Sequence, residues 1–359
     1  MNGTDSSRTN DLPFASEVHR AAGSEIQTDL VSVVIPAFNA EATINDTLTS
    51  VRNQTHRNLE IIVVDDGSAD RTRSIVAAHA SLDPRVTIIS RENAGVATAR
   101  NIGWKCAQSE YIAFVDADDL WSPTKIENQL RVMLAGGERI GLVYTWFAVI
   151  DEGNRIRSKG PGRHIDGDVI QDALMGNFIG NASSPLIRRR ALETVGGYDS
   201  ALRNAGAQGC EDMQIYYRIA RKFYFGLVPE HLTGYRVVAG RMSSDRLRMF
   251  RSFCIVADEM KLDYPESAEK IDVGIRLYLE FLIGEALVFR DFRQVLSLLS
   301  STFLSHRWDR IVILVSVLRA KIIWLRWKLQ WRLRWAGALL TGQTIERSDT
   351  VFPIGELKV

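Results

Sequence analysis

The 359-residue sequence predicts an α/β fold: a mostly parallel sheet with helices on both faces, followed by a helical C-terminal extension. Three observations lead to this prediction. Apolar, β-branched runs of strand length alternate with segments of helical spacing between residues 31 and 150. A polar cluster follows each of the first four runs. Helical patterns then predominate from Met242 to Phe303. Regular alternation of strands and helices is typical of a parallel sheet, because each crossover helix packs on a face of the sheet.

The individual elements can be assigned in chain order. Strands are expected at residues 31–35, 59–64, 86–89, 111–115 and 141–150. Helices are expected around 44–51 and 75–76, over 95–107, and from an N-cap at Ser122 with Pro123 in the first helical position. Beyond residue 150 we expect a loop at 151–168 and helices at 187–195 and 211–222.

The composition is ordinary for a globular protein, with 46% hydrophobic and 24% charged residues. The net charge of +1 creates no general attraction to nucleic acid. Cys106, Cys210 and Cys254 are widely spaced, so neither a disulfide framework nor a zinc site is indicated, and a cytoplasmic compartment is expected. Residues 1–30 are polar and lack the apolar centre of a signal peptide, so we expect a mobile tail. No apolar run reaches the ~20 residues of a membrane-spanning helix.

The polar clusters all lie where predicted strands end. Asn39 follows the first strand, Asp65 and Asp66 the second, Asn93 the third, and Asp116-Ala117-Asp118 the fourth. Ligands of parallel sheets bind in the crevice at the carboxyl ends of the strands. We therefore expect these side chains to form one shared active site.

Asp116 and Asp118 are spaced to present two carboxylates to one hard cation. Mg²⁺ or Mn²⁺ would accept these oxygens together with phosphate oxygens and water. Such a metal would neutralise the charge that builds on a leaving diphosphate. The alternative is a solvated acidic turn that begins a helix, but the three other polar strand ends favour a ligand site.

Two further clusters have both a functional and a structural interpretation. In Asp65-Asp66-Gly67-Ser68, a carboxylate could bind a base or a ribose hydroxyl, or the segment could simply cap a helix. The Asn93-Ala94-Gly95 segment leads into a helix that contains Arg100. Arg100 could orient the carboxylates of Asp116 and Asp118, reach a phosphate, or be a plain surface arginine.

Taken in order, these motifs resemble those of the family 2 glycosyltransferases, which have the GT-A fold. The resemblance covers roughly residues 31–240. The matching segments are Val34-Ile35-Pro36-Ala37-Phe38-Asn39, Asp65-Asp66-Gly67-Ser68, Asn93-Ala94-Gly95 with Ala99-Arg100-Asn101, Phe114-Val115-Asp116-Ala117-Asp118-Asp119 with Trp121 and Pro123, Gly196-Gly197-Tyr198-Asp199, and Glu211-Asp212.

The resemblance implies an inverting transfer from a nucleotide-diphosphate sugar, often a UDP-sugar, with Mn²⁺ or Mg²⁺ as cofactor. Asp66 would contact the base or ribose, Asp116 would lie against the ribose, and Asp118 would be the principal metal ligand. The whole nucleotide-sugar site would comprise Pro36, Phe38, Asn39, Asp65, Asp66, Asn93, Gly95, Arg100, Asp116 and Ala117. By the same analogy Asp212 would be the general base and Glu211 would shape the acceptor site. The alternative for this pair is favourable charge at a helix N-terminus.

One segment departs from the family pattern. Many relatives carry Tyr-Arg-x-His, whereas this chain has Tyr235-Arg236-Val237-Val238. Either no such histidine is used, or Arg236 or Arg241 serves the diphosphate instead.

Residues 305–340 combine an apolar stripe with basic and tryptophan side chains. The stripe consists of Ile311, Val315, Leu318, Ile322, Leu325, Leu329 and Leu333, with Trp324, Trp327, Trp331 and Trp335 interleaved. This composition is typical of an interfacial helix on anionic lipid. The alternatives are a helix packed on the catalytic domain and a partner-binding helix. No nucleic-acid partner is expected, since the rest of the chain shows no matching basic face.

We accordingly divide the chain into five parts. They are a tail at 1–30, a GT-A domain at 31–240 with a nucleotide-sugar half at 31–125 and an acceptor half at 126–240, a helical extension at 241–304, a membrane-interface helix at 305–340, and a C-terminal tail at 341–359.

The hypothesis is a glycosyltransferase on the inner face of the cell membrane, acting on a glycan or lipid-linked acceptor for a surface polysaccharide. The alternatives are a sugar nucleotidyltransferase, which usually needs a glycine- and basic-rich loop after the first strand, and a non-catalytic nucleotide-binding protein.

Overall fold

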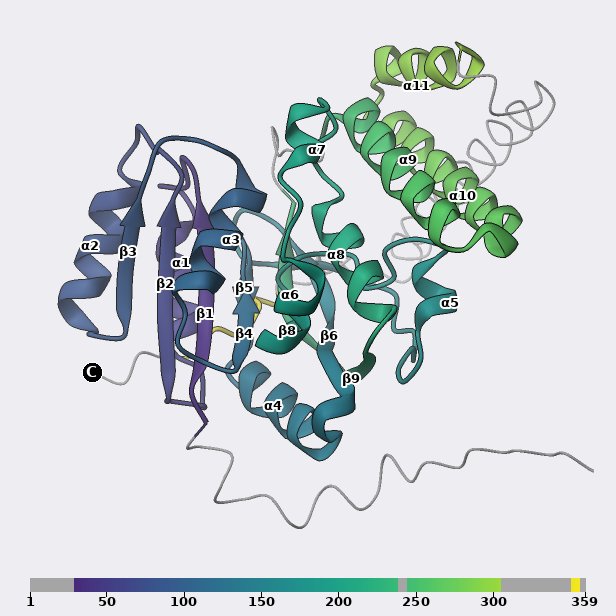
Figure 1. The fold of residues 1–359 in the computed structure, drawn as a ribbon. Coiled ribbons are helices and arrows are strands. Elements are labelled where there is room, and N and C mark those ends of the chain that lie inside the picture. The colour runs from purple at the N-terminus through teal and green to yellow at the C-terminus, as the bar shows by residue number, and fades with distance from the viewer. Residues whose placement is uncertain (1–28, 238–243, 305–349, 356–359) are drawn as a thin grey trace, which may run out of the picture.

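The computed structural model describes residues 29–237, 244–304 and 350–355 of the chain. In this part a sheet carries helices on both faces, and further helices gather at one side of the molecule (Figure 1). The α/β class expected from the sequence is confirmed. The helix predicted at 305–340, the tail up to residue 28, and Arg241 lie outside the described residues.

Within the described residues, nine strands form one sheet. They are β1 (Val31–Ala37), β2 (Leu59–Asp65), β3 (Val86–Ser90), β4 (Tyr111–Phe114), β5 (Leu120–Trp121), β6 (Ile140–Ile150), β7 (Ile156–Lys159), β8 (Leu186–Arg188) and β9 (Tyr224–Arg236). The strand order is β3-β2-β1-β4-β8-β6-β9-β5, and β7 pairs with β6 outside this path. Strands β1 to β4 run parallel to one another, as predicted, so their carboxyl ends lie at one edge of the sheet.

Beyond β4 the sheet is mixed. Strand β8 is antiparallel to both β4 and β6, whereas β6 and β9 are parallel. The helix predicted over 187–195 is therefore wrong at its start, because Ile187 and Arg188 belong to β8 and the helix α6 begins afterwards (Arg189–Val195). A strand of three buried residues is too short to show a periodicity that separates strand from helix. The loop expected at 151–168 contains β7, and β9, interrupted by Gly226, Pro229 and Gly234, carries no strand signal.

The remaining helices between residues 29 and 237 lie around the sheet. They are α1 (Ile44–Arg52), α2 (Thr72–Leu82), α3 (Val96–Cys106), α4 (Lys125–Ala135), α5 (Ile170–Ala173), α7 (Ala201–Asn204) and α8 (Glu211–Ala220), with a 3₁₀ turn at Gly137–Arg139. The predicted N-cap at Ser122 is wrong, since α4 begins at Lys125 after Thr124. The Ser122 amide instead donates to the carbonyl of Leu232 at 2.9 Å, which extends the pairing of β5 with β9.

Two apolar layers hold the helices to the sheet. Every residue of β1 is buried, and its alternate side chains enter opposite layers: Val33 and Ile35 pack on one face and Val34 on the other. This burial on both faces explains why the strand is a continuous apolar run rather than an alternating one. Packing in these layers fixes where each strand ends. It therefore also fixes the position of the polar residues that follow the strands.

Three helices form the extension predicted from Met242 to Phe303. They are α9 (Arg246–Asp263), α10 (Ala268–Val288) and α11 (Phe292–Leu304), with a 3₁₀ turn at Pro265–Ser267. A separate apolar cluster joins them to α8, in which Met213 and Tyr217 meet Phe250 and Phe253. Arg218 of α8 adds an ion pair with Glu259, whose Oε1 lies 2.6 Å from the arginine Nε. The extension therefore supports the helix that begins with Glu211 and Asp212.

Residues 350–355, within the predicted C-terminal tail, pack on the sheet. Phe352 is 2% exposed and lies in a cluster with Leu120, Ala148 and Ile150. The Ile156 amide donates to the carbonyl of Thr350 at 2.9 Å. These six residues are therefore part of the packing around the sheet.

Candidate functional site

The polar strand ends meet at the carboxyl edge of β1 to β4. The amide of Asn39 donates to Oγ of Ser68 at 2.9 Å, which joins the ends of β1 and β2. The carboxylate of Asp66 accepts hydrogen bonds from the amides of Ala94, at 3.0 Å, and Gly95, at 2.7 Å. The structure thus brings together the residues that the sequence placed after the first three strands.

Several of these side chains are engaged by the backbone. Asp65 is fully buried and accepts from the amide of Ser68 at 3.1 Å, which is the turn-capping arrangement considered as its alternative. The Asn39 side chain accepts from the amide of Ala69 at 2.9 Å. Pro36 lies within β1, whereas Phe38 is 53% exposed just after the strand ends. Phe38 thus offers an exposed aromatic ring, and Asn39 and Asn93 of the predicted nucleotide site are exposed as well.

Arg100 of α3 reaches the acidic turn after β4. Its Nη2 lies 2.5 Å from Oδ1 of Asp116, and the arginine is only 4% exposed, so the surface-arginine alternative is wrong. Burial alone would lower the pKa of Arg100, but the charge of Asp116 raises it above the usual value. The guanidinium therefore stays charged and orients one carboxylate of the predicted metal pair.

Two side chains from other segments, Ser183 and Thr47, hold the acidic turn in place. Oγ of Ser183 accepts from the amide of Asp116 at 3.0 Å and donates to Oδ2 of Asp119 at 2.5 Å. Thr47 of α1 donates to the carbonyls of Ala117, at 3.0 Å, and Asp119, at 2.9 Å. Burial, with the neighbouring charges of Asp118 and Asp116, raises the pKa of Asp119 well above its usual value. Asp119 thus fixes the turn, while Asp116 and Asp118 remain partly exposed.

Arg236 at the end of β9 braces the same turn. Its amide donates to Oδ1 of Asp119 at 2.8 Å and its Nε donates to the carbonyl of Asp118 at 2.6 Å. Its Nη1 donates to the carbonyls of Asp151, at 2.9 Å, and Glu152, at 3.2 Å. With 2% of its surface exposed, Arg236 supports the acidic turn through backbone carbonyls, and this bracing role was missed in the sequence.

Glu211 and Asp212 are the first two residues of α8. Oδ2 of Asp212 accepts from Nδ2 of Asn177 at 2.9 Å. Burial raises the pKa of Asp212, with a further rise from Asp116, whereas Arg100 and the Asn177 hydrogen bond lower it. Burial also raises the pKa of Glu211, which accepts from the amide of Gly209 at 2.9 Å. The charges of Arg100 and Asp116 thus affect the pKa of Asp212, although both residues are about 100 positions away in the sequence.

Other residues of the site carry no clear sequence signal. Tyr198 is buried, and the centre of its ring lies 5.2 Å from the guanidinium carbon of Arg100, so the ring packs against that arginine. Arg203 of α7 donates to Oδ1 of Asn93 at 2.7 Å and links the two halves of the domain. Only Tyr198 lay in a motif quoted for the resemblance, and Asn177 lay in no recognisable pattern.

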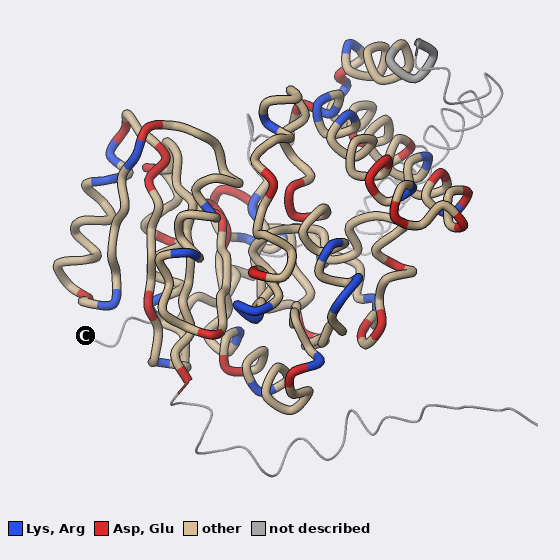
Figure 2. Tube along the Cα trace, in the orientation of Figure 1, with Lys and Arg blue, Asp and Glu red and all other residues tan. Residues whose placement is uncertain are grey.

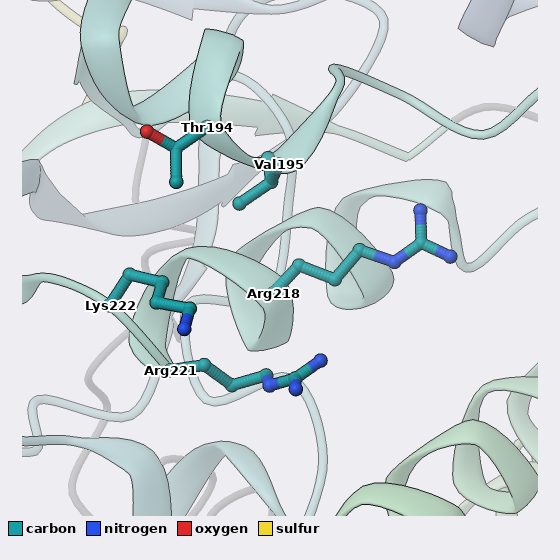
Figure 3. Close-up of a pocket in the computed structure, with 5 residues that line it drawn as sticks. All are labelled: Thr194, Val195, Arg218, Arg221 and Lys222. Carbon is teal, nitrogen blue, oxygen red and sulfur yellow. The ribbon is translucent and has the colours of Figure 1, made fainter.

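A separate pocket lies at the opposite end of α8. It is lined by Thr194, Val195, Arg218, Arg221 and Lys222 (Figure 3). Arg218 pairs with Glu259, and Nη1 of Arg221 lies 2.6 Å from Asp263. Because its arginines are already paired and it lies at the far end of the helix from Asp212, this pocket is distinct from the predicted site.

The fold matches that of solved glycosyltransferases. The mannosyltransferase PcManGT from Pyrobaculum calidifontis, determined in complex with GDP-Man and Mn2+, has a TM-score of 0.51 to this chain. The match covers 81% of this chain and 79% of that chain at 17% identity, a level that establishes the fold alone. Fold and site together define a GT-A type glycosyltransferase.

Sequence comparison gives the family. The model for glycosyl transferase family 2 matches residues 32–196. An uncharacterized glycosyltransferase of Haemophilus influenzae is 31% identical over 227 residues, which are 60% of this chain and 68% of the relative. The chain belongs to glycosyl transferase family 2.

Two relatives with more specific names match shorter stretches. The putative teichuronic acid biosynthesis glycosyltransferase TuaG of Bacillus subtilis is 44% identical over 106 residues, 29% of this chain and 42% of the relative. The UDP-Glc:alpha-D-GlcNAc-diphosphoundecaprenol beta-1,3-glucosyltransferase WfgD of Escherichia coli is 40% identical over 123 residues, 34% of this chain and 47% of the relative. The chain thus spans less than half the length of either relative.

Proposed function

We propose that this glycosyltransferase transfers a sugar, with inversion, from a UDP-sugar to a hydroxyl of a glycan or lipid-linked acceptor in surface polysaccharide biosynthesis. The observation that carries the proposal is the position of Asp212, a partly buried carboxylate at the start of α8 that accepts a hydrogen bond from Asn177 and whose pKa responds to both Arg100 and Asp116. A single displacement needs a base opposite the leaving group, and α8 supplies one beside the donor-side carboxylates. The name of the Escherichia coli relative supports the UDP-sugar and the lipid-linked acceptor.

On the donor side, the nucleotide would lie along the carboxyl edge of β1, β2 and β4. Phe38 offers an exposed ring to the base, and Asp66 shapes the loop at Asn93 to Gly95 through its two hydrogen bonds. Asp116, held by Arg100, would face the ribose. The nucleotide-sugar half at 31–125 would thus bind the donor, and the acceptor half at 126–240 would supply the base.

The acidic turn fits a divalent cation, Mn²⁺ or Mg²⁺. Asp116 and Asp118 would hold it, since both are partly exposed carboxylates on a turn whose backbone Thr47 and Arg236 fix. Among the described residues, no three His, Cys, Asp or Glu side chains gather into a set that could hold a metal by themselves. Two carboxylates suffice for a cation that takes its remaining ligands from phosphate and water. When bound, the cation neutralises charge on the leaving diphosphate.

Asp212 would remove the proton from the acceptor hydroxyl as that oxygen attacks the sugar. The burial that raises its pKa makes the carboxylate a stronger base, and Arg100 and Asn177 favour its ionised form. Glu211, buried beside it, would shape the acceptor site.

The protein would act on the cytoplasmic side of the cell membrane as a peripheral protein, through residues 305–340. The basic and tryptophan-rich composition of that segment supports this location. In the part of the chain that the structure describes, no helix is long and apolar enough to cross a bilayer.

A donor screen followed by a transfer assay tests the proposal. A panel of nucleotide sugars is added with and without Mn²⁺, and the melting temperature is measured, because a ligand that binds the folded state stabilises it. We expect one UDP-sugar to raise the melting temperature and to support transfer to a hydroxyl acceptor with inverted stereochemistry. Synthesis of a nucleotide sugar from a sugar phosphate, or binding without turnover, would contradict the proposal.

A further inference from the structure

Helices α10 and α11 carry a set of large apolar side chains that are exposed. The exposed fractions of its six members lie between 41% and 67%. They are Leu277, Phe281, Val288, Phe289, Phe292 and Leu296, and we call them the α10–α11 face. Three of the six are phenylalanines, which have large apolar side chains. Exposed together, they leave more apolar surface in contact with water than single scattered leucines do.

The spacing shows that this face is separate from the core. Leu277, Phe281 and Val288 are four and seven residues apart, so they share one side of α10. Leu279 and Ile283, which bind the extension to the rest of the protein, lie on the opposite side. Gly284 falls within the exposed row and has open space around it. The α10–α11 face is therefore a second apolar stripe rather than the edge of the core.

Charge is distributed unevenly along the face. Exposed Arg290 and Arg293 flank Phe289 and Phe292 where α10 passes into α11. Figure 2 shows basic residues at the start of α11 and acidic residues at the opposite end, where α9 turns into α10. The acids nearest the basic end, Glu285 and Asp291, both pair with Arg246, at 3.5 and 4.0 Å. Among the described residues neither Arg290 nor Arg293 forms an ion pair, and phenylalanines beside such arginines match the chemistry of an anionic lipid interface.

The sequence that follows α11 has the same chemistry. Residues 305–340 contain eight Lys or Arg, one Asp and five Trp. From the basic start of α11 the chain runs along that helix to Leu304 and then enters its most basic and tryptophan-rich stretch. A second copy of the protein would not need this continuity of positive charge, whereas an anionic membrane would attract both parts.

We propose that the α10–α11 face docks on the surface of an anionic lipid bilayer, an inference that rests on the membrane location given above and extends it to a folded surface. The consequence concerns orientation. The same extension packs through Phe250 and Phe253 on α8, which carries Asp212. Docking would therefore hold the acceptor side of the catalytic domain in one orientation relative to the bilayer. A lipid-linked acceptor would be embedded in that same bilayer.

The test uses the full-length chain and vesicle flotation. F281S/F292S removes two phenylalanines without adding charge, and L82S, at a 76% exposed leucine on α2, is the matched control. With vesicles of equal parts phosphatidylcholine and phosphatidylglycerol, we expect the partition of F281S/F292S to fall roughly tenfold or more and that of L82S to match the wild type. R290Q/R293Q should weaken binding to these vesicles but not to pure phosphatidylcholine.

Two results would overturn the inference. One is flotation of both double variants at the wild-type level. The other is a lipid-free wild-type dimer, by light scattering, that F281S/F292S converts to a monomer, because the face would then be a contact between copies. Transfer to a water-soluble acceptor should be unchanged in F281S/F292S, which separates this inference from the proposed function. A wild type without transferase activity that still floats would contradict only the proposed function.

Discussion

Nδ2 of Asn177 donates a hydrogen bond to Oδ2 of Asp212 at 2.9 Å. The Asn177 side-chain oxygen accepts in turn from the amides of Ile179, at 3.1 Å, and Gly180, at 2.8 Å, so the orientation of its amide group is set by the backbone. The hydrogen bond opposes the rise in the pKa of Asp212 that burial causes. Asn177 therefore belongs to the machinery that keeps the proposed base ionised.

Replacing Asn177 by alanine should shift the pH dependence of transfer. Loss of the hydrogen bond raises the pKa of Asp212 further, because the bond favours the charged form. The base acts only when ionised, so the acidic limb of kcat/KM against pH should move to higher pH while activity at alkaline pH persists. The control is Asn128→Ala, at a partly exposed residue on α4 whose side chain bonds Glu230. A profile identical to that of the wild type would remove Asn177 from this role.

Replacing Asp212 by asparagine should stop transfer but spare the donor. Loss of a general base costs about 10²–10⁴ in rate. Donor binding depends on the other side of the site, so the rise in melting temperature with the donor should persist. Single-turnover transfer and thermal shift on the same sample measure the two effects. Turnover near the wild-type rate would show that another group accepts the proton.

Replacing Asp118 by alanine should remove the response to Mn²⁺. The variant loses one of two proposed ligands while Thr47, Ser183 and Arg236 still hold the turn, so the fold should remain intact. Stabilisation of the leaving group by a metal contributes several kcal/mol, which corresponds to a loss of about 10²-fold or more in rate. The measurement is the initial rate across a Mn²⁺ titration, with Asp166→Ala, at an exposed loop carboxylate, as control. An unchanged titration curve would refute the assignment.

Replacing Phe352 by alanine should destabilise the catalytic domain. The ring is buried against Leu120 and Ile150, and truncating a buried phenylalanine costs about 3–5 kcal/mol. Urea unfolding measures the change in the free energy of unfolding. Val351→Ala, at the exposed neighbour, should change it by less than about 0.5 kcal/mol. Equal stability of the two variants would show that residues 350–355 add nothing to the fold.

The parallel half of the sheet was predictable because its signals are local. Strand β1 is buried on both faces, so it reads as an unbroken apolar run, and the run stops near the strand end. Strands β5 and β8 contain two and three residues, too few to show a period. The N-cap predicted at Ser122 was wrong because pairing of β5 with β9 outweighed a local preference for beginning the helix there.

The sequence by itself determined that the polar residues after the parallel strands would lie together. Parallel strands end at one edge, so residues that follow β1, β2, β3 and β4 had to converge wherever those strands paired. Only the tertiary structure decided how the acidic turn and Asp212 are held. Ser183 reaches Asp119 across 64 positions, Arg236 reaches it across 117, and Asn177 reaches Asp212 across 35. Such contacts depend on how β8, β9 and α8 pack, and the packing of distant segments leaves no local pattern in the chain.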